Sequence, residues 1–286
     1  MFVIIGCIVV IGGVLGGFTW AGGHVEALIH PSEIVTIGGA ALGAMIIMSP
    51  TKVLKDLMKG IIGSLKGSPF NKGAYEELFK CMYHLLRVAR RDGLLALESH
   101  VSNPHESDIF HKYPGIHKNH HVCDFICGAL SPVIEGAIPP ERVPELLATE
   151  LKAMAEEHHA PLNVLGKTAD GLPGFGIVAA VLGIVITMGH IGGPVEEIGH
   201  KVGAALVGTF LGILASYGFL APLNTRLEFI GEAELSFFKS IAAIVEGFVH
   251  NLPPKVAVDQ ARRGVPTEFR PTRERVEELF KEVEAA

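Results

Sequence analysis

Four long apolar segments of this chain contain no ionised side chain, and this limits the chemistry that they can perform. The segments are residues 2–20, 34–48, 172–191 and 202–223. The polar groups within them are hydroxyls, chiefly those of Thr36, Thr187, Thr209, Ser216 and Tyr217. An ion that crosses an apolar layer must be received by a carboxylate or a similar partner. If ions pass along these segments, we expect another chain to supply that carboxylate.

Two prolines stand at corresponding ends of the third and fourth apolar segments. Pro173 follows the start of the third segment, and Pro222 precedes the end of the fourth. A proline has no backbone N–H, so it leaves a carbonyl free to contact water or an ion. This pattern could mark a gate, but prolines are also common where helices begin or end. The sequence leaves both interpretations open.

One stretch carries residue types that bind metals, namely His117, His120, His121, Cys123 and Cys127. The two cysteines have the spacing C-x3-C, and no second pair follows to complete a tetrahedral site. We therefore favour surface histidines leading into a helix, with zinc binding as the alternative. The chain also contains no Gly-rich phosphate loop, no G-x-S-x-G and no HExxH motif, so we expect neither enzymatic activity nor a cofactor.

The composition indicates a membrane protein. Hydrophobic residues make up 49% of the 286 residues and charged residues only 19%, and the mean hydropathy is +0.39, which is high for a water-soluble chain. A net charge of −6 gives no reason to expect a nucleic-acid partner. The four cysteines are scattered in a way that fits no disulfide framework.

The lengths and flanks of the apolar segments predict four membrane-spanning helices. At about 1.5 Å per residue, the first, third and fourth segments can cross roughly 30 Å of hydrocarbon. The second is shorter, and its assignment also rests on the adjacent Leu28 and Ile29. We expect the first segment to be retained as an anchor, with a cleaved signal peptide as the alternative.

Basic residues give the expected topology. None of the 24 Lys and Arg residues lies in residues 1–33 or 168–200. The short connections within these ranges, residues 21–33 and 192–200, are therefore predicted to be external, and both termini cytoplasmic. The fold class is then all-α, an integral membrane protein with four transmembrane helices and a helical cytoplasmic region. The expected parts are residues 1–48 (helices 1 and 2), 49–171 (cytoplasmic), 172–223 (helices 3 and 4) and 224–286 (cytoplasmic tail).

The cytoplasmic parts read as amphipathic helices. Apolar residues recur at helical spacing over residues 74–97, 140–157 and 272–284. Within the membrane segments, glycines occur in small-xxx-small pairs that allow close helix packing, either within one subunit or between subunits. They are Gly12, Gly13, Gly16, Gly17, Gly39 and Gly43.

Two stretches resemble a known family, the flagellar motor stator A subunit of MotA type. The first is Ala89-Arg90-Arg91-Asp92-Gly93-Leu94-Leu95-Ala96-Leu97-Glu98, which is similar to the family's A-R-x-x-G-x-x-x-L-E stretch. The second is Pro173-Gly174-Phe175-Gly176-Ile177-Val178-Ala179-Ala180-Val181-Leu182-Gly183, which resembles the start of its third span. Members share the arrangement of two spans, a cytoplasmic segment, two more spans and a tail.

The resemblance implies a function and partners. Five copies of the A subunit would surround two copies of a B subunit (MotB type) in the bacterial inner membrane, and the B subunit's membrane aspartate would accept the ion. Charged residues of the cytoplasmic segment would contact the rotor switch protein (FliG type), here Arg90 and Glu98. If the helix continues past Gly93, Arg91 rather than Arg90 would share a face with Glu98. The resemblance also favours gating by Pro173 and Pro222, and more weakly an assembly role for Glu150.

The sequence is also compatible with two other functions. A related energy-transducing subunit of ExbB/TolQ type would serve outer-membrane processes and would usually have three spans and an external N-terminus. The other alternative is a membrane scaffold that conducts no ions.

The transported ion is predicted from a single position in the third segment. Sodium-type members of the family resembled carry a threonine there, and this chain has Ala180. Alanine offers no side-chain oxygen, and Thr209 is then the main hydroxyl expected to face the partner's aspartate. Sodium needs several oxygen ligands, whereas a proton needs an acceptor and a path of water. We therefore expect proton coupling.

Overall fold

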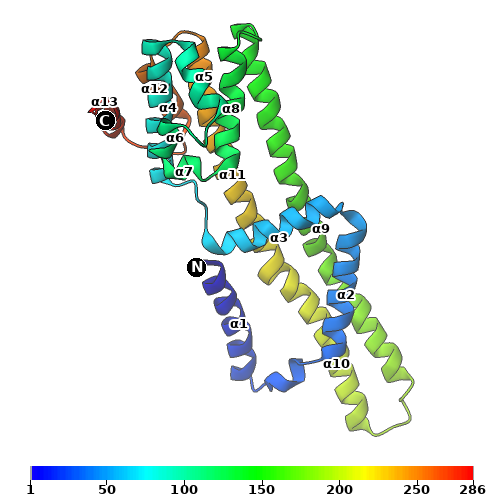
Figure 1. The fold of residues 1–286 in the computed structure, drawn as a ribbon. Helices are drawn as coiled ribbons and strands as arrows, with labels where there is room; N and C mark the ends of the chain where they lie inside the picture. The colour runs from blue at the N-terminus through cyan, green and yellow to red at the C-terminus, as the bar shows by residue number, and fades with distance from the viewer. Residues whose placement is uncertain (1, 286) are drawn as a thin grey trace. The chain divides into compact units, whose positions relative to one another are not determined.

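The computed structural model describes residues 2–285, and every regular element in this range is a helix (Figure 1). The predicted all-α membrane class is confirmed, because four helical segments are long and apolar enough to cross a bilayer. These segments are Phe2–Trp20, Val25–Met48, Pro140–Met188 and Val195–Val249. The chain divides into two compact units, which are described separately below.

The first unit comprises Met1–Gly67 and Glu157–Ile230 and holds the apolar helices. Its complete elements are α1 (Phe2–Trp20), the short 3-10 helix η1 (Val25–Leu28), α2 (Pro31–Met48), α3 (Thr51–Lys66), α10 (Val195–Ile213) and the π-helical segment η3 (Leu214–Leu220). It also takes in the later part of α9 (Val143–Met188) and the first part of α11 (Ala221–Val249). The helix of the third apolar segment therefore begins well before residue 172, and that of the fourth continues well beyond residue 223.

Helix α2 begins earlier than the apolar pattern indicates. Pro31 occupies its first turn and His30 is its N-cap, so the helix also contains Glu33. The expectation that no span carries an ionisable side chain is therefore wrong for the second span. The signal was present in the sequence, since proline is favoured at the first position of a helix.

Helices α9 and α10 approach each other closely through small residues. A Cβ atom added at Gly212 would lie 2.6 Å from the Leu172 carbonyl oxygen, and one added at Gly176 would lie 2.8 Å from the Gly208 carbonyl oxygen. Ordinary contact between such atoms begins near 3.5 Å. Glycine at these positions is what allows the two backbones to touch.

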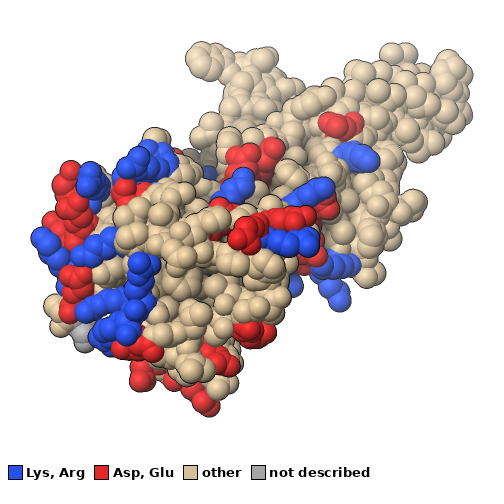
Figure 2. Space-filling view, turned by 90° about the horizontal axis from the view of Figure 1, so that it is seen from above, with Lys and Arg blue, Asp and Glu red and all other residues tan. Residues whose placement is uncertain are grey.

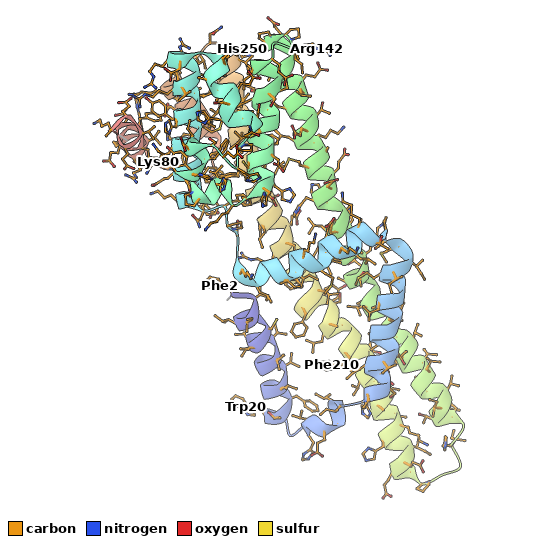
Figure 3. All side chains as sticks on the ribbon, viewed as in Figure 1. Phe2, Trp20, Lys80, Arg142, Phe210 and His250 are labelled. Carbon is orange, nitrogen blue, oxygen red and sulfur yellow. The ribbon has the colours of Figure 1, made fainter. Side chains whose placement is uncertain are left out.

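Helix α1 has a different environment. It is apolar on all sides and none of its described residues is buried within the chain, and its end residues Phe2 and Trp20 are exposed (Figure 3). A Cβ added at any of Gly12, Gly13, Gly16 or Gly17 would meet no atom within 4 Å. The same holds for Gly39 and Gly43 on α2. These glycines do not serve packing within one chain, so their use between subunits remains a prediction.

The second unit comprises Ser68–Glu156 and Gly231–Ala286. Its complete helices are α4 (Lys72–Asp92), α5 (Leu94–Ser102), α6 (Asp108–His111), α7 (Pro114–His117), α8 (His120–Ile134), the 3-10 helix η2 (Pro140–Arg142), α12 (Pro254–Gly264) and α13 (Arg273–Ala285). It also takes in the first part of α9 and the later part of α11. The apolar face of α4 forms much of one core, in which Tyr75, Phe79 and Phe237 are almost fully buried. Acidic and basic side chains are interspersed on the face seen in Figure 2.

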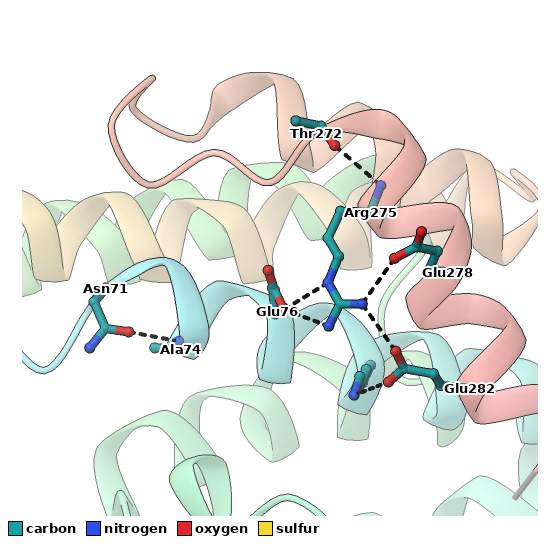
Figure 4. A network of polar contacts seen from close by, with 8 residues as sticks. Asn71, Ala74, Glu76, Thr272, Arg275, Glu278 and Glu282 are labelled. Carbon is teal, nitrogen blue, oxygen red and sulfur yellow. Dashed lines mark hydrogen bonds and ion pairs between the residues drawn. The ribbon is translucent and has the colours of Figure 1, made fainter.

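Local signals fix the ends of the helices in this unit. Asn71 accepts a hydrogen bond from the Ala74 N–H at the start of α4, and Thr272 accepts one from the Arg275 N–H at the start of α13 (Figure 4). The Arg275 guanidinium then binds Glu76 through both Nε and Nη2, at 3.1 and 3.0 Å, and tethers α13 to α4. The predicted helix over 272–284 is thus confirmed, and its partner is α4.

The predicted helix over residues 74–97 is wrong at its end. Gly93 has a φ of 91°, which favours glycine, and it separates α4 from α5. The condition under which Arg91 would share a helix face with Glu98 is therefore not met.

Candidate functional site

Ala180 and Thr209, the two residues predicted to lie on the ion path, come from helices that are in direct contact. Ala180 is buried on α9 and Thr209 is half-buried on α10. A Cβ added at Gly208 would lie 3.3 Å from the Ala180 nitrogen, and one added at Gly176 would lie 3.3 Å from the Thr209 Cα. The structure therefore places both residues at the contact between the third and fourth spans. With no side-chain oxygen on Ala180, Thr209 supplies the hydroxyl at this level.

Pro173 and Pro222 lie inside continuous helical segments and not at helix ends. Pro173 stands within the 46-residue helix α9. Pro222 is the second residue of α11 and directly follows the π-helical segment η3, which continues from α10. The explanation of ordinary end-of-helix prolines therefore does not describe either residue. Each removes one hydrogen bond from the middle of a long helix.

The surroundings of the two prolines are also linked. Leu172 and Leu220, which stand near Pro173 and Pro222 in the sequence, pack in one apolar cluster with Ile37 of α2. Within η3, Ser216 is completely buried and its hydroxyl has no hydrogen-bond partner among the described residues. π-Helical turns are frequently found at functional sites because they loosen the regular hydrogen-bond pattern. This part of the fourth span therefore departs from regular α-helical hydrogen bonding.

The two residues predicted to contact the rotor differ in their surroundings. Arg90 is exposed at the end of α4, and its Nη1 donates to the carbonyl oxygens of Asn251 and Leu252 at 3.2 and 3.4 Å. Glu98 is exposed on α5, and the structure records no hydrogen bond or ion pair for it with any described residue. The Arg90 guanidinium therefore also holds the turn after α11, whereas the Glu98 carboxylate is available to a partner.

Arg91 and Glu150 both lie at the surface of the chain. Arg91 pairs with Asp92 through two contacts of 2.8 Å, which lower the pKa of the Asp92 carboxyl. Because this pair is exposed, it adds little to stability. Glu150 is exposed on α9.

The histidines and cysteines of residues 117–127 do not form one site. Cys123 and Ile126 lie on the buried face of α8, as predicted, and a hydrogen bond from the neighbouring Cys127 lowers the pKa of the Cys123 thiol. The His117 ring instead packs edge to face against those of His105 and His111, with ring centroids 5.5 and 4.7 Å apart. In the part of the chain that the structure describes, no group of three or more metal-ligating side chains is placed to hold a metal ion.

Comparisons with known proteins agree with this arrangement. Residues 4–93 match the model of the motility protein A N-terminal family, and residues 117–239 match that of the MotA/TolQ/ExbB proton channel family. The match to the first model favours the motility branch over the ExbB/TolQ alternative. Both family models describe a channel or motility component and not a known class of enzyme.

Individual relatives extend the similarity to the whole chain. Motility protein A of Salmonella typhimurium is 35% identical over 99% of this chain and 96% of its own length. Chemotaxis protein LafT of Vibrio parahaemolyticus is 36% identical over 95% of each chain. Among solved structures, the flagellar MotAB stator complex from Bacillus subtilis has a chain with a TM-score of 0.74 and 25% identity, covering 96% of this chain and 97% of its own. The C. jejuni MotAB structure shares the fold with a TM-score of 0.77 at 21% identity, over 95% of this chain and 98% of its own. This chain is a multi-pass membrane protein that belongs to the motility protein A family.

Proposed function

We propose that this chain is the A subunit of a flagellar stator and that, with a B subunit of MotB type, it forms a channel that converts proton-motive force into torque. The observation that carries the proposal is the similarity to motility protein A of Salmonella typhimurium over 99% of the chain. Pro173 and Pro222 interrupt the backbone hydrogen bonding within the apolar segments, and this supports a moving channel over a purely scaffolding protein.

Ion transfer would take place along the contact between α9 and α10. The B subunit would place its membrane aspartate near Ala180 and Thr209. Few oxygen ligands surround this point, and this supports a proton as the transported ion. Loading and unloading of the aspartate would then bend the two spans at Pro173 and Pro222, where a backbone hydrogen bond is already missing.

Torque would leave the complex through the second unit. Glu98 offers an exposed carboxylate and Arg90 an exposed guanidinium to a rotor switch protein of FliG type. The unpaired glycine faces of α1 and α2 support assembly of several copies, and a pentamer around two B subunits is the family's arrangement. The distribution of Lys and Arg supports an inner-membrane location with both termini in the cytoplasm.

The proposal is tested by complementation. This chain and its own B subunit are expressed in a flagellated strain that lacks its native stator genes, and swimming is recorded. We expect swimming only when both proteins are present, and none when the membrane aspartate of the B subunit is replaced by asparagine. Absence of swimming although both proteins reach the membrane and assemble with each other would contradict the proposal.

A further inference from the structure

Glu33 is a buried carboxylic acid inside a membrane-spanning helix. It lies in the first turn of α2 and is 7% exposed. Its Oε2 atom is buried and has no hydrogen-bond partner among the described residues. Ionisable residues buried at membrane depth are costly, and they usually mark the route of an ion.

The Glu33 carboxyl group lies where three helices of the first unit meet. A Cβ atom added at Gly208 of α10 would lie only 2.5 Å from Glu33 Oε2. The same point is 3.2 Å from the Ala179 Cβ and 3.3 Å from the Ala180 nitrogen, both on α9. Gly208 thus leaves room for the carboxyl group, which is held beside the residues proposed to line the ion path.

This meeting point is near the middle of the apolar part of α9, although Glu33 stands in the first turn of α2. Ala180 stands eight residues from both Leu172 and Met188 in α9. That is about 12 Å along the helix in either direction. Gly208 is 13 residues after the start of α10 at Val195, or about 20 Å. Glu33 therefore faces the middle of the third span and not its end.

An ionised carboxylate without a partner in such a place would be strongly unfavourable. Protonation of the carboxyl group removes this cost, because the neutral acid carries no charge into the apolar surroundings. We propose that Glu33 is a proton-binding site inside the membrane-spanning bundle, from which protons pass to the carboxylate of the B subunit. This inference rests on the proposed stator function and adds a second carboxyl group to the path.

A proton fits this site better than sodium. Gly208, Ala179 and Ala180, which lie on the α9 and α10 side of the carboxyl group, contribute no side-chain oxygen. Sodium would need several oxygen ligands to replace its water shell, whereas a proton needs only the carboxyl group. Sodium binding at Glu33 would therefore require ligands that these three residues do not offer.

Other titratable groups of the neighbouring elements stand near or beyond the ends of the apolar segments. Lys201 lies seven residues before Gly208 on the same face of α10, and it pairs with Glu197 at 2.8 Å. From Val202 to Thr225 the chain has no Asp, Glu, His, Lys or Arg. The acids and imidazoles on or beside α2 and α10 are Glu26, His24, His30, His190, Glu196 and His200. On α9, Lys167 and Asp170 stand 13 and 10 residues before Ala180.

The test combines infrared spectroscopy with motor speed. Purified complexes of the chain with its B subunit are titrated with acid, and the carbonyl stretching band of protonated carboxyl groups is followed. The variants are Glu33→Gln, which keeps the shape but cannot titrate, and Glu33→Asp, which keeps the acid. The matched control is Glu26→Gln, because Glu26 is exposed in η1. Any carboxyl group gives such a band once it is protonated, so proton flux and swimming are measured for the same variants, because a purely structural role for Glu33 would leave proton flux through an assembled Glu33→Gln complex unchanged.

We expect one band of the wild-type complex to be absent from Glu33→Gln, shifted in Glu33→Asp and unchanged in Glu26→Gln. Proton flux through Glu33→Gln should fall about 100-fold, the lower end of what a positioned proton-transferring group contributes, and swimming should stop. A Glu33→Gln complex that keeps every band or swims at wild-type speed overturns the inference. If the Glu33→Gln complex fails to assemble, a Glu33→Asp spectrum identical to that of the wild type also overturns the inference. A band that responds to sodium and not to acid overturns the choice of ion.

The wild-type chain in the same cells separates this inference from the proposed function. If the wild-type pair does not drive swimming, the stator proposal itself fails. If the wild-type pair swims and the Glu33 variants behave as the wild type, only the proton-binding site at Glu33 is refuted.

Discussion

Gly212→Ala should separate the third and fourth spans, because no space exists for a methyl group at this position. The added Cβ would lie 2.6 Å from the Leu172 carbonyl oxygen, 2.9 Å from the Gly176 Cα and 3.1 Å from the Gly176 nitrogen. The closest of these is about 1 Å short of ordinary contact. All three atoms belong to the backbone of α9, which cannot rotate away as a side chain can. Overpacking of this kind typically destabilises a fold by about 1–3 kcal/mol.

The matched control is Gly203→Ala on the same helix, where the added Cβ would meet no atom within 4 Å. In both variants alanine is the better helix former by about 1 kcal/mol. The difference between them therefore isolates the clash with α9. We expect Gly203→Ala to match or exceed the wild-type melting temperature of the detergent-solubilised complex, and Gly212→Ala to melt lower and to drive slower swimming. Equal melting temperatures and equal swimming for the two variants would refute the close contact of α9 and α10.

Further predictions concern torque, coupling and pH. Charge reversal of Glu98 should abolish or slow swimming and leave assembly unchanged, as measured by co-purification of the B subunit. Charge reversal of Arg90 should also lower the melting temperature, because the variant loses two hydrogen bonds to the turn after α11. Replacing Pro173 or Pro222 with leucine should restore a backbone hydrogen bond and reduce motor speed under load. Wild-type speed in either variant would show that this proline has no role in coupling. Burial, with the neighbouring positive charges, lowers the pKa of His84 from 6.5 to about 4. The folded protein should lose stability as pH falls from about 6.5 to about 4, because in this range His84 binds a proton only in the unfolded chain. If the melting temperature of His84→Gln falls as steeply with pH as that of the wild type, this histidine is not the cause.

Much of the fold follows from local signals in the sequence. Apolar length predicts the four spans, and the helical spacing of Leu78, Met82 and Leu85 predicts the buried face of α4. The family resemblance depends on Arg90, Glu98 and the stretch from Pro173 to Gly183, and the comparisons confirm it. These features are readable because each depends on neighbours that are close in the chain.

The errors occur where local and tertiary effects compete. A single glycine within a helical pattern need not end a helix, but Gly93 adopts a φ of 91° and divides α4 from α5. Prolines near the ends of apolar segments normally mark helix ends, yet Pro173 stands inside α9 because packing maintains the helix on both sides.

Glu33 was missed for two different reasons. Its place in α2 could have been read from the proline at position 31, which marks the first turn of a helix. Its burial against Gly208 could not, because the two residues are 175 positions apart and no local sequence pattern relates them. The candidate rotor residues were found from the resemblance alone, since an exposed charged pair has no distinct pattern of its own.

The central claim, a proton-driven stator, is tested most directly by the ion dependence of swimming. Cells that carry this chain and its B subunit as their only stator are observed in sodium-free potassium buffer, and then at constant external sodium after addition of a protonophore. With Ala180 and Gly208 beside the path and few oxygen ligands available, we predict full speed without sodium and arrest by the protonophore. Swimming that stops without sodium but survives the protonophore would contradict the account.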